Sequence, residues 1–143
     1  MLHHDGSWSH EGVPFTNRRL RERFDRAVCY LPEERAFAVR IGRFRGFVEV
    51  EEAAFFVRSF DPDAGAIGLS DGSRERLDPS SLGVSPRDGA LLCRVKRDLA
   101  PPRGLLARFG HAAQAELLSA VEATPRGPRL RAGGALHRLP DLG

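Results

Sequence analysis

Apolar residues in the first third of the chain are spaced three or four apart, which puts them on one face of a helix. The positions concerned are Leu20, Phe24, Ala27, Val28 and Leu31. We expect a helix over about Asn17 to Cys29, with Thr16 as its N-cap and Pro32 just beyond its end.

The spacing then changes from 3.6 to 2, as in strands. Phe37, Val39 and Ile41 are followed, after Arg43–Gly46, by alternating Val48 and Val50. This predicts a hairpin with a four-residue loop. In that register Ile41 lies opposite Val48 and Val39 opposite Val50, while Arg40 faces Glu49 on the other side.

Further short strands are predicted before and after a Pro-containing stretch, residues 79–90, which looks like a linker or a long loop. The expected strands are Ala54–Phe60, Ile67–Leu69, Arg74–Leu77 and Leu91–Val95. Helical spacing returns from Leu105 to about Ala123, and a last hairpin between Leu130 and Leu139 turns at Gly133-Gly134.

These elements divide the chain into two halves. The N-terminal half, residues 1–78, contains a helix at about 17–29 and strands at about 36–60 and 66–77. The C-terminal half, residues 91–143, contains a strand, a helix at about 105–123 and a terminal hairpin. Each half contains a helix followed by a hairpin. We therefore predict an α+β fold of two small halves, each a helix packed on antiparallel strands, with a duplicated motif.

The amino-acid composition adds information about charge and about the cellular compartment. Among 22 basic residues Lys96 is the single lysine, and the net charge is +3. Arginine suits phosphate and carboxylate recognition, but the same bias follows from a genome whose codons favour Arg, Ala and Gly. The polar start of the chain and the lack of a long apolar run predict a cytoplasmic protein, in which Cys29 and Cys93 serve as small buried apolar residues.

Six residues are candidates for binding a ligand or a polyanion. Arg19, Arg23 and Arg26 share one flank of the first helix, and Phe44 lies between Arg43 and Arg45 at the hairpin tip. Two ordinary explanations stay open. Helix charges spaced by four, such as Arg18 with Glu22 and Arg21 with Asp25, solvate a helix face, and Phe44 can pack on a neighbouring helix.

Catalytic and metal motifs are weak. Gly68-Leu69-Ser70-Asp71-Gly72 fits a nucleophile elbow, with His111 and His137 as conceivable bases. However, the chain is too short for the large parallel sheet that such an elbow requires. A hairpin turn is therefore the better interpretation of this motif. The group His3, His4, Asp5 and His10 contains metal-ligating side chains, yet a flexible N-terminal segment explains it as well. We expect no catalytic residue, no metal and no cofactor.

Several motifs resemble the bacterial domain of unknown function 1285 (DUF1285) family. They are Asp5-Gly6-Ser7-Trp8, Gly12-x-Pro14, Val48–Phe55, Leu105–Arg108 and Arg131–Gly134. The resemblance implies two small α+β halves and an unassigned role, for which signalling or regulation has been suggested. The chain departs from the family pattern at Ile41–Gly46, which replaces a Thr-Pro-x-Glu-Lys stretch, and at Ala54, where proline is usual.

The sequence therefore predicts a non-catalytic ligand-binding or regulatory module with a small-molecule or protein partner and no membrane. The alternative is binding of nucleic acid or another polyanion through the arginine-rich face, and a hydrolase is third. Apolar tip residues such as Phe44 leave a homodimer open as well.

Overall fold

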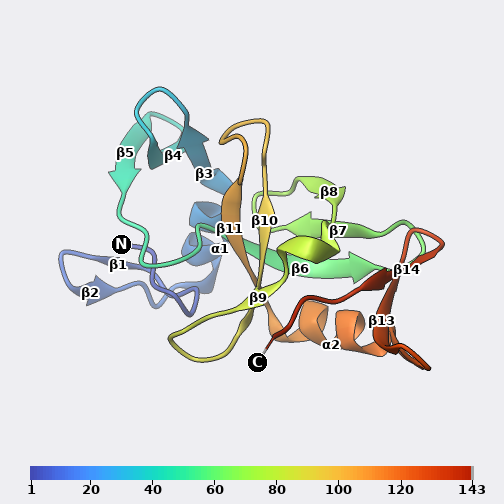
Figure 1. The fold of residues 1–143 in the computed structure, drawn as a ribbon. Coiled ribbons are helices and arrows are strands. Elements are labelled where there is room, and N and C mark those ends of the chain that lie inside the picture. Colours follow the sequence, from blue (N-terminus) through green and yellow to red (C-terminus); the bar gives the residue numbers. More distant parts are fainter. Residues whose placement is uncertain (143) are drawn as a thin grey trace.

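A six-stranded, curled sheet forms the centre of the molecule (Figure 1). The computed structural model describes residues 1–142. The strand order is β8-β7-β6-β11-β10-β9. The strands are β6 (Phe55–Asp61), β7 (Ala66–Leu69), β8 (Arg74–Arg76), β9 (Gly83–Val84), β10 (Leu91–Val95) and β11 (Leu105–Phe109).

Two segments far apart in the sequence meet at the middle of this sheet. There β6 and β11 run parallel, with Phe55 opposite Ala107 and Val57 opposite Phe109, whereas the other strand pairs of the sheet are antiparallel. Phe55, Val57 and Ala107 have no exposed surface. This pair is the centre of the core.

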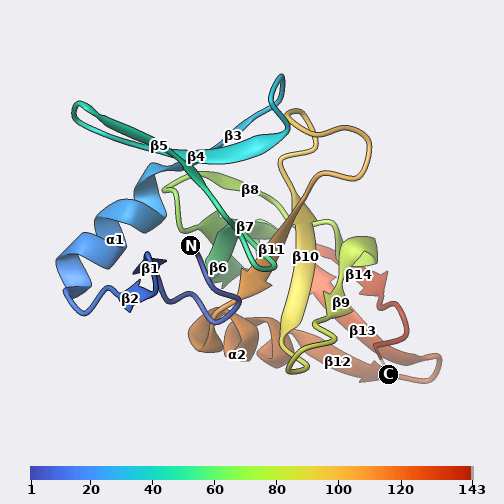
Figure 2. The ribbon, with the colours of Figure 1, turned by 90° about the vertical axis from the view of Figure 1, so that its left-hand side faces the viewer.

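Each of two short helices is followed by a three-stranded antiparallel meander. Near the N-terminus the elements are β1 (Ser9–His10), β2 (Val13–Pro14), α1 (Arg18–Ala27), β3 (Val28–Leu31), β4 (Ala36–Ile41) and β5 (Phe44–Val48). Near the C-terminus they are α2 (His111–Ser119), β12 (Val121–Thr124), β13 (Gly127–Ala132) and β14 (Ala135–Arg138). A 3₁₀ turn, η1 (Pro79–Ser81), lies between β8 and β9. Figure 2 shows the β3–β5 meander at one end of the molecule and α2 with β12–β14 at the other.

The expected α+β class is wrong, because the fold is mainly β. Strands β6–β8 precede residue 79 and β9–β11 follow it, yet they form one sheet through the β6–β11 pair. The arrangement is therefore not a helix packed on hairpins in each half. Sequence periodicity describes neighbours along the chain and carries no signal for a pairing between residues about fifty positions apart.

Both predicted helices are too long. Helix α1 begins after Asn17, whose side chain accepts a hydrogen bond from the Leu20 amide at 3.2 Å, so Asn17 and not Thr16 is the N-cap. Val28 already belongs to β3, because it pairs with Val39 of β4. The stretch Leu105–Phe109 is strand β11, since alternate side chains from Leu105 are buried in the sheet.

The predicted register of the first hairpin is also wrong. Gly42 and Arg43 form a two-residue turn, and Gly42 has a φ of +58°, a left-handed conformation that glycine adopts easily. Phe44 consequently lies opposite Ile41. The same shift places Arg45, and not Glu49, opposite Arg40.

The N-terminal segment is part of the core. Leu2 is fully buried and bridges to Val50 and Trp8. Aromatic rings join this segment to α1, since the ring centroid of Phe24 lies 5.3 Å from that of Trp8 and 5.0 Å from that of Phe15. No helix within residues 1–142 is both long and apolar enough to cross a membrane.

The two cysteines differ in exposure, which gives a test of the core. Cys93 is fully buried in β10, and burial raises the pKa of its thiol to about 12, whereas Cys29 is partly exposed. Because the thiolate is the reactive form, we expect a thiol reagent to leave Cys93 unmodified in the folded protein and to label it on unfolding. Mass spectrometry of labelled peptides measures this, and rapid native labelling of Cys93 would contradict the described core.

Candidate functional site

A cleft of about 830 Å³ lies between α1 and the N-terminus of α2. Its walls come from the loop at Asp5 and Gly6, from α1, from the strands β6 and β11, and from the loop at Asp88–Ala90. Most of its polar lining consists of charged side chains. We call it the α1–α2 cleft.

Helix α1 presents one polar face to this cleft. Arg18, Arg21 and Asp25 are spaced by three and four residues and so share a face, next to the apolar face that contains Phe24. The Asp25 carboxylate accepts a hydrogen bond from Trp8 Nε1 at 2.8 Å and one from Arg58 Nη2 at 2.9 Å. Burial raises the pKa of Asp25, although these two partners act in the opposite direction. Asp25 thus ties α1 to the N-terminal segment and to β6.

The opposite wall is built at the end of β11. Arg108 donates two hydrogen bonds to Asp88, at 3.1 and 2.6 Å, and its Nη1 lies 3.8 Å from a Glu52 carboxylate oxygen. The two bonds from Arg108 hold the pKa of Asp88 down at about 2. This bidentate pair attaches the loop at Asp88–Ala90 to the sheet.

The N-terminus of α2 opens into the cleft. Its N-cap is Gly110, which has no side chain to cap the helix, and no side chain from residues 1–142 caps it instead. The amides of a first helical turn have no acceptor inside the helix and carry a partial positive charge. His111 and Gln114 line the cleft beside them.

Arg21 supplies a second donor without an acceptor. Its Nε is buried and makes no hydrogen bond with any other residue from 1 to 142. Leaving a buried donor unpaired costs on the order of 1–3 kcal/mol. The other arginines that line the cleft form ion pairs. Arg18 pairs with Glu22 at 3.0 Å, Arg58 with Asp25 and Arg108 with Asp88. The donors left over therefore favour an anion.

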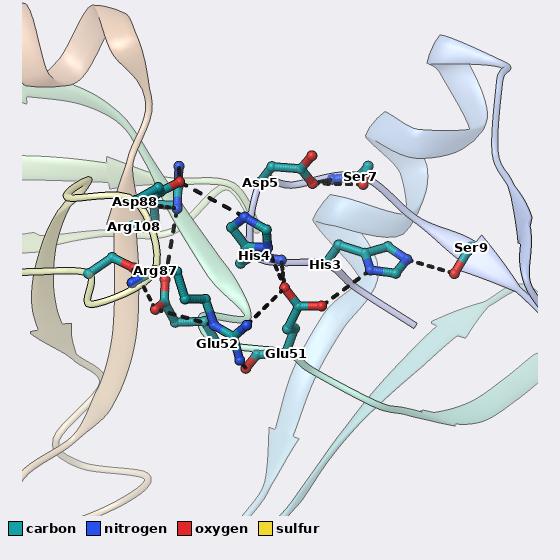
Figure 3. A network of polar contacts seen from close by, with 11 residues as sticks. His3, His4, Asp5, Ser7, Ser9, Glu51, Glu52, Arg87, Asp88 and Arg108 are labelled. Carbon is teal, nitrogen blue, oxygen red and sulfur yellow. Dashed lines mark hydrogen bonds and ion pairs between the residues drawn. The ribbon is translucent and has the colours of Figure 1, made fainter.

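A polar network beside the cleft fastens the N-terminal segment (Figure 3). His3 and His4 lie on either side of Glu51: His3 Nδ1 is 3.5 Å from one carboxylate oxygen and His4 Nδ1 contacts the other. Arg87 lies 3.5 Å from Glu51 and 3.8 Å from Glu52. The histidines thus bind a carboxylate and belong to an ordered part of the fold, contrary to a flexible N-terminus.

The conceivable metal and nucleophile motifs find structural explanations. Within residues 1–142 no group of three or more metal-ligating side chains could hold an ion. Ser70 is buried, accepts a hydrogen bond from the Phe56 amide at 2.9 Å and lies before the β7–β8 turn, as the hairpin interpretation predicts.

Comparison with solved structures identifies the fold. A DUF1285 family protein from Silicibacter pomeroyi DSS-3 has a TM-score of 0.62 at 18% identity, over 96% of this chain and 77% of that one. Another from Shewanella baltica OS155 has a TM-score of 0.51 at 15% identity, over 82% of this chain and 88% of that one. This chain has the DUF1285 fold. No family model matches its sequence, and no curated protein does.

The resemblance to DUF1285 proteins is thus confirmed for the fold. The six predicted binding residues lie outside the cleft of this DUF1285 fold. Arg19, Arg23, Arg26, Arg43 and Arg45 are exposed and make no ion pair within residues 1–142. Phe44 contacts Phe24 at a centroid distance of 6.3 Å, which joins the hairpin to α1, and yet 55% of it is exposed. Arg58 pairs with Asp25.

The cleft residues were hard to recognise from sequence. Arg21 has the spacing of an ordinary helix ion pair with Asp25, but Asp25 bonds instead to Trp8 and Arg58, and Arg21 is left over. The one available signal is a glycine, Gly110, directly before helical residues and directly after a strand-like apolar stretch.

The Arg108–Asp88 pair predicts an acid-sensitive component of stability. Because the folded pKa of Asp88 is lowered to about 2, its contribution is present above the unfolded value of 3.8 and is lost as pH falls toward 2. We expect the wild type to lose more of its urea midpoint between about pH 5 and pH 2.5 than Asp88→Asn does. Equal losses in both proteins would show that the pair contributes nothing.

Proposed function

We propose that this chain is a non-catalytic module that binds a small anionic molecule, a carboxylate or a phosphate, in the α1–α2 cleft. The observation that carries the proposal is the unpaired, buried Nε of Arg21 in the same cleft as the uncapped N-terminus of α2. Arg21 and the first turn of α2 thus line one volume, and each has a donor that lacks an acceptor. An anion satisfies both at once.

The size and the walls of the cleft fit a small molecule. A volume of about 830 Å³ is within the range of ligand pockets, roughly 300–1,000 Å³. Phe56 and Phe109 supply apolar surface, and Gly6 lies against the Phe56 ring. Asp5 adds a carboxylate at the rim, so a ligand with a hydroxyl or amino group beside its anionic group has a partner there.

The fact that separate segments of the chain line the cleft supports a regulatory or signalling role. Five segments distant in sequence line the cleft, and they are held by a few polar contacts such as Asp25 with Trp8 and Arg108 with Asp88. A ligand that bridges them stabilises one arrangement of the N-terminal segment relative to the sheet. Such coupling is what a sensor module needs.

Substitution of Arg21 separates binding from folding. In Arg21→Met the apolar stem is kept and the unpaired donor is removed, so we expect the free energy of unfolding without ligand to rise by about 1 kcal/mol. The same change should weaken anion binding at least about tenfold, which corresponds to 1.4 kcal/mol. Thermal unfolding and calorimetry with inorganic phosphate and a panel of small carboxylates measure both quantities.

Arg19→Met is the matched control. It removes the same charge from the same helix, but Arg19 is exposed and does not line the cleft. It should leave anion affinity within about twofold, because Arg19 makes no contact in the cleft and its exposed charge is solvated. The proposal is wrong if no anion stabilises the wild type, or if both variants bind as the wild type does.

A further inference from the structure

The positive charge of the chain is concentrated in one segment. Residues 17–48 hold nine arginines against four acidic residues, a net charge of +5, whereas the remaining residues hold 13 basic and 15 acidic groups. Two of the four acidic residues already form ion pairs, Glu22 with Arg18 and Asp25 with Arg58. The segment that forms α1 and the β3–β5 meander is therefore the basic part of the molecule.

The register of the meander brings two arginines face to face. Arg40 of β4 lies directly opposite Arg45 of β5, and Ala38 lies opposite Phe47 in the neighbouring pair. Because side chains alternate along strands, these four residues share one face. Phe37 and Val39 point to the other face, where Phe37 contacts the core residue Phe55. The four residues Ala38, Arg40, Arg45 and Phe47 define the outer hairpin face.

A like-charged pair directly across two strands is destabilising. Arg40 and Arg45 are exposed and make no ion pair with any residue from 1 to 142. No acidic side chain on the described part of the chain relieves the repulsion. A bound anion would relieve it.

An aromatic ring lies beside the two arginines. Phe47 is 73% exposed, the most exposed of the large apolar side chains from 1 to 142. It lines a shallow hollow of about 220 Å³ together with Leu31, Arg40, Arg45 and Gly46. An exposed ring beside cations on a strand face is an arrangement on which unpaired bases stack.

We propose that the outer hairpin face binds single-stranded nucleic acid. A base stacks on the Phe47 ring, and Arg40 and Arg45 bind the adjoining phosphates. Arg43 at the turn is exposed and adds positive charge beside this face. Duplexes fit the face less well, because their bases are stacked and cannot cover Phe47. This proposal does not depend on the α1–α2 cleft.

Fluorescence anisotropy with a labelled oligothymidylate of about 20 nucleotides tests the proposal. We expect Arg40→Gln/Arg45→Gln to weaken binding at least about tenfold and to reduce the slope of log affinity against log salt by about 1.4, since single strands release about 0.7 counterions per phosphate. Phe47→Ala should weaken binding at least about fivefold through lost stacking, with an unchanged salt slope.

Arg103→Gln/Arg126→Gln is the matched control. It removes two exposed arginines that lie outside the basic segment, so affinity should stay within about threefold of the wild type. All the substituted side chains are exposed, and Arg40→Gln/Arg45→Gln should melt no lower than the wild type, because it relieves a like-charge pair.

Three results would overturn the proposal. The first is no binding of the oligonucleotide at low salt. The second is equal affinity for a duplex of the same length, which points to nonspecific charge attraction. The third is binding of phosphatidylglycerol vesicles without oligonucleotide binding, which assigns the outer hairpin face to a lipid surface.

Discussion

The parallel pairing of β6 with β11 is the constraint on which the rest of the structure depends. Its residues Phe55, Val57 and Ala107 are fully buried, and it is the single parallel contact between strands of the six-stranded sheet. Parallel strands need a long connection, and here the connection contains β7 to β10. The pairing therefore decides where β9 to β11, and α2 and β12–β14 after them, lie relative to β6.

The cleft is a direct result of this pairing. Because β11 runs beside β6 and leads directly into α2, the N-terminus of α2 reaches the volume that α1 bounds from the other side. Asp25, through Trp8 and Arg58, and Asp88, through Arg108, neutralise most of the charge in the walls. What remains is the Arg21 side chain with the first-turn amides of α2, and the Asp5 carboxylate at the rim. The cleft is separate from the exposed arginines of the β3–β5 meander, which do not line it.

Local sequence patterns predicted several features that depend on residues close together in the chain, such as a helix start and two turns. Helix α1 starts within one residue of the expected position, the turn at Gly133-Gly134 lies where predicted, and Ser70 lies in a hairpin context. One local feature was predicted wrongly, the register of the first hairpin, because Gly42 and Arg43 form a two-residue turn. The wrong assignment of Leu105–Phe109 came from a pairing at a distance. Leu105–Phe109 has adjacent apolar residues that fit a helix as well as a strand, and only the partner β6 decides between them. The cleft was hidden for the same reason, since Arg21 is unpaired only because Asp25 takes Trp8 and Arg58 as partners.

The most direct test of the account is a two-dimensional NMR titration of the wild type with inorganic phosphate. It follows the backbone amides and the arginine Nε–H groups, so it reports on both kinds of donor. The account predicts that the largest shift changes occur at the amides of His111 and Ala112 and at Arg21 Nε–H, with one common affinity. Changes confined to exposed arginines such as Arg43 and Arg45, with the α2 amides unmoved, would contradict it.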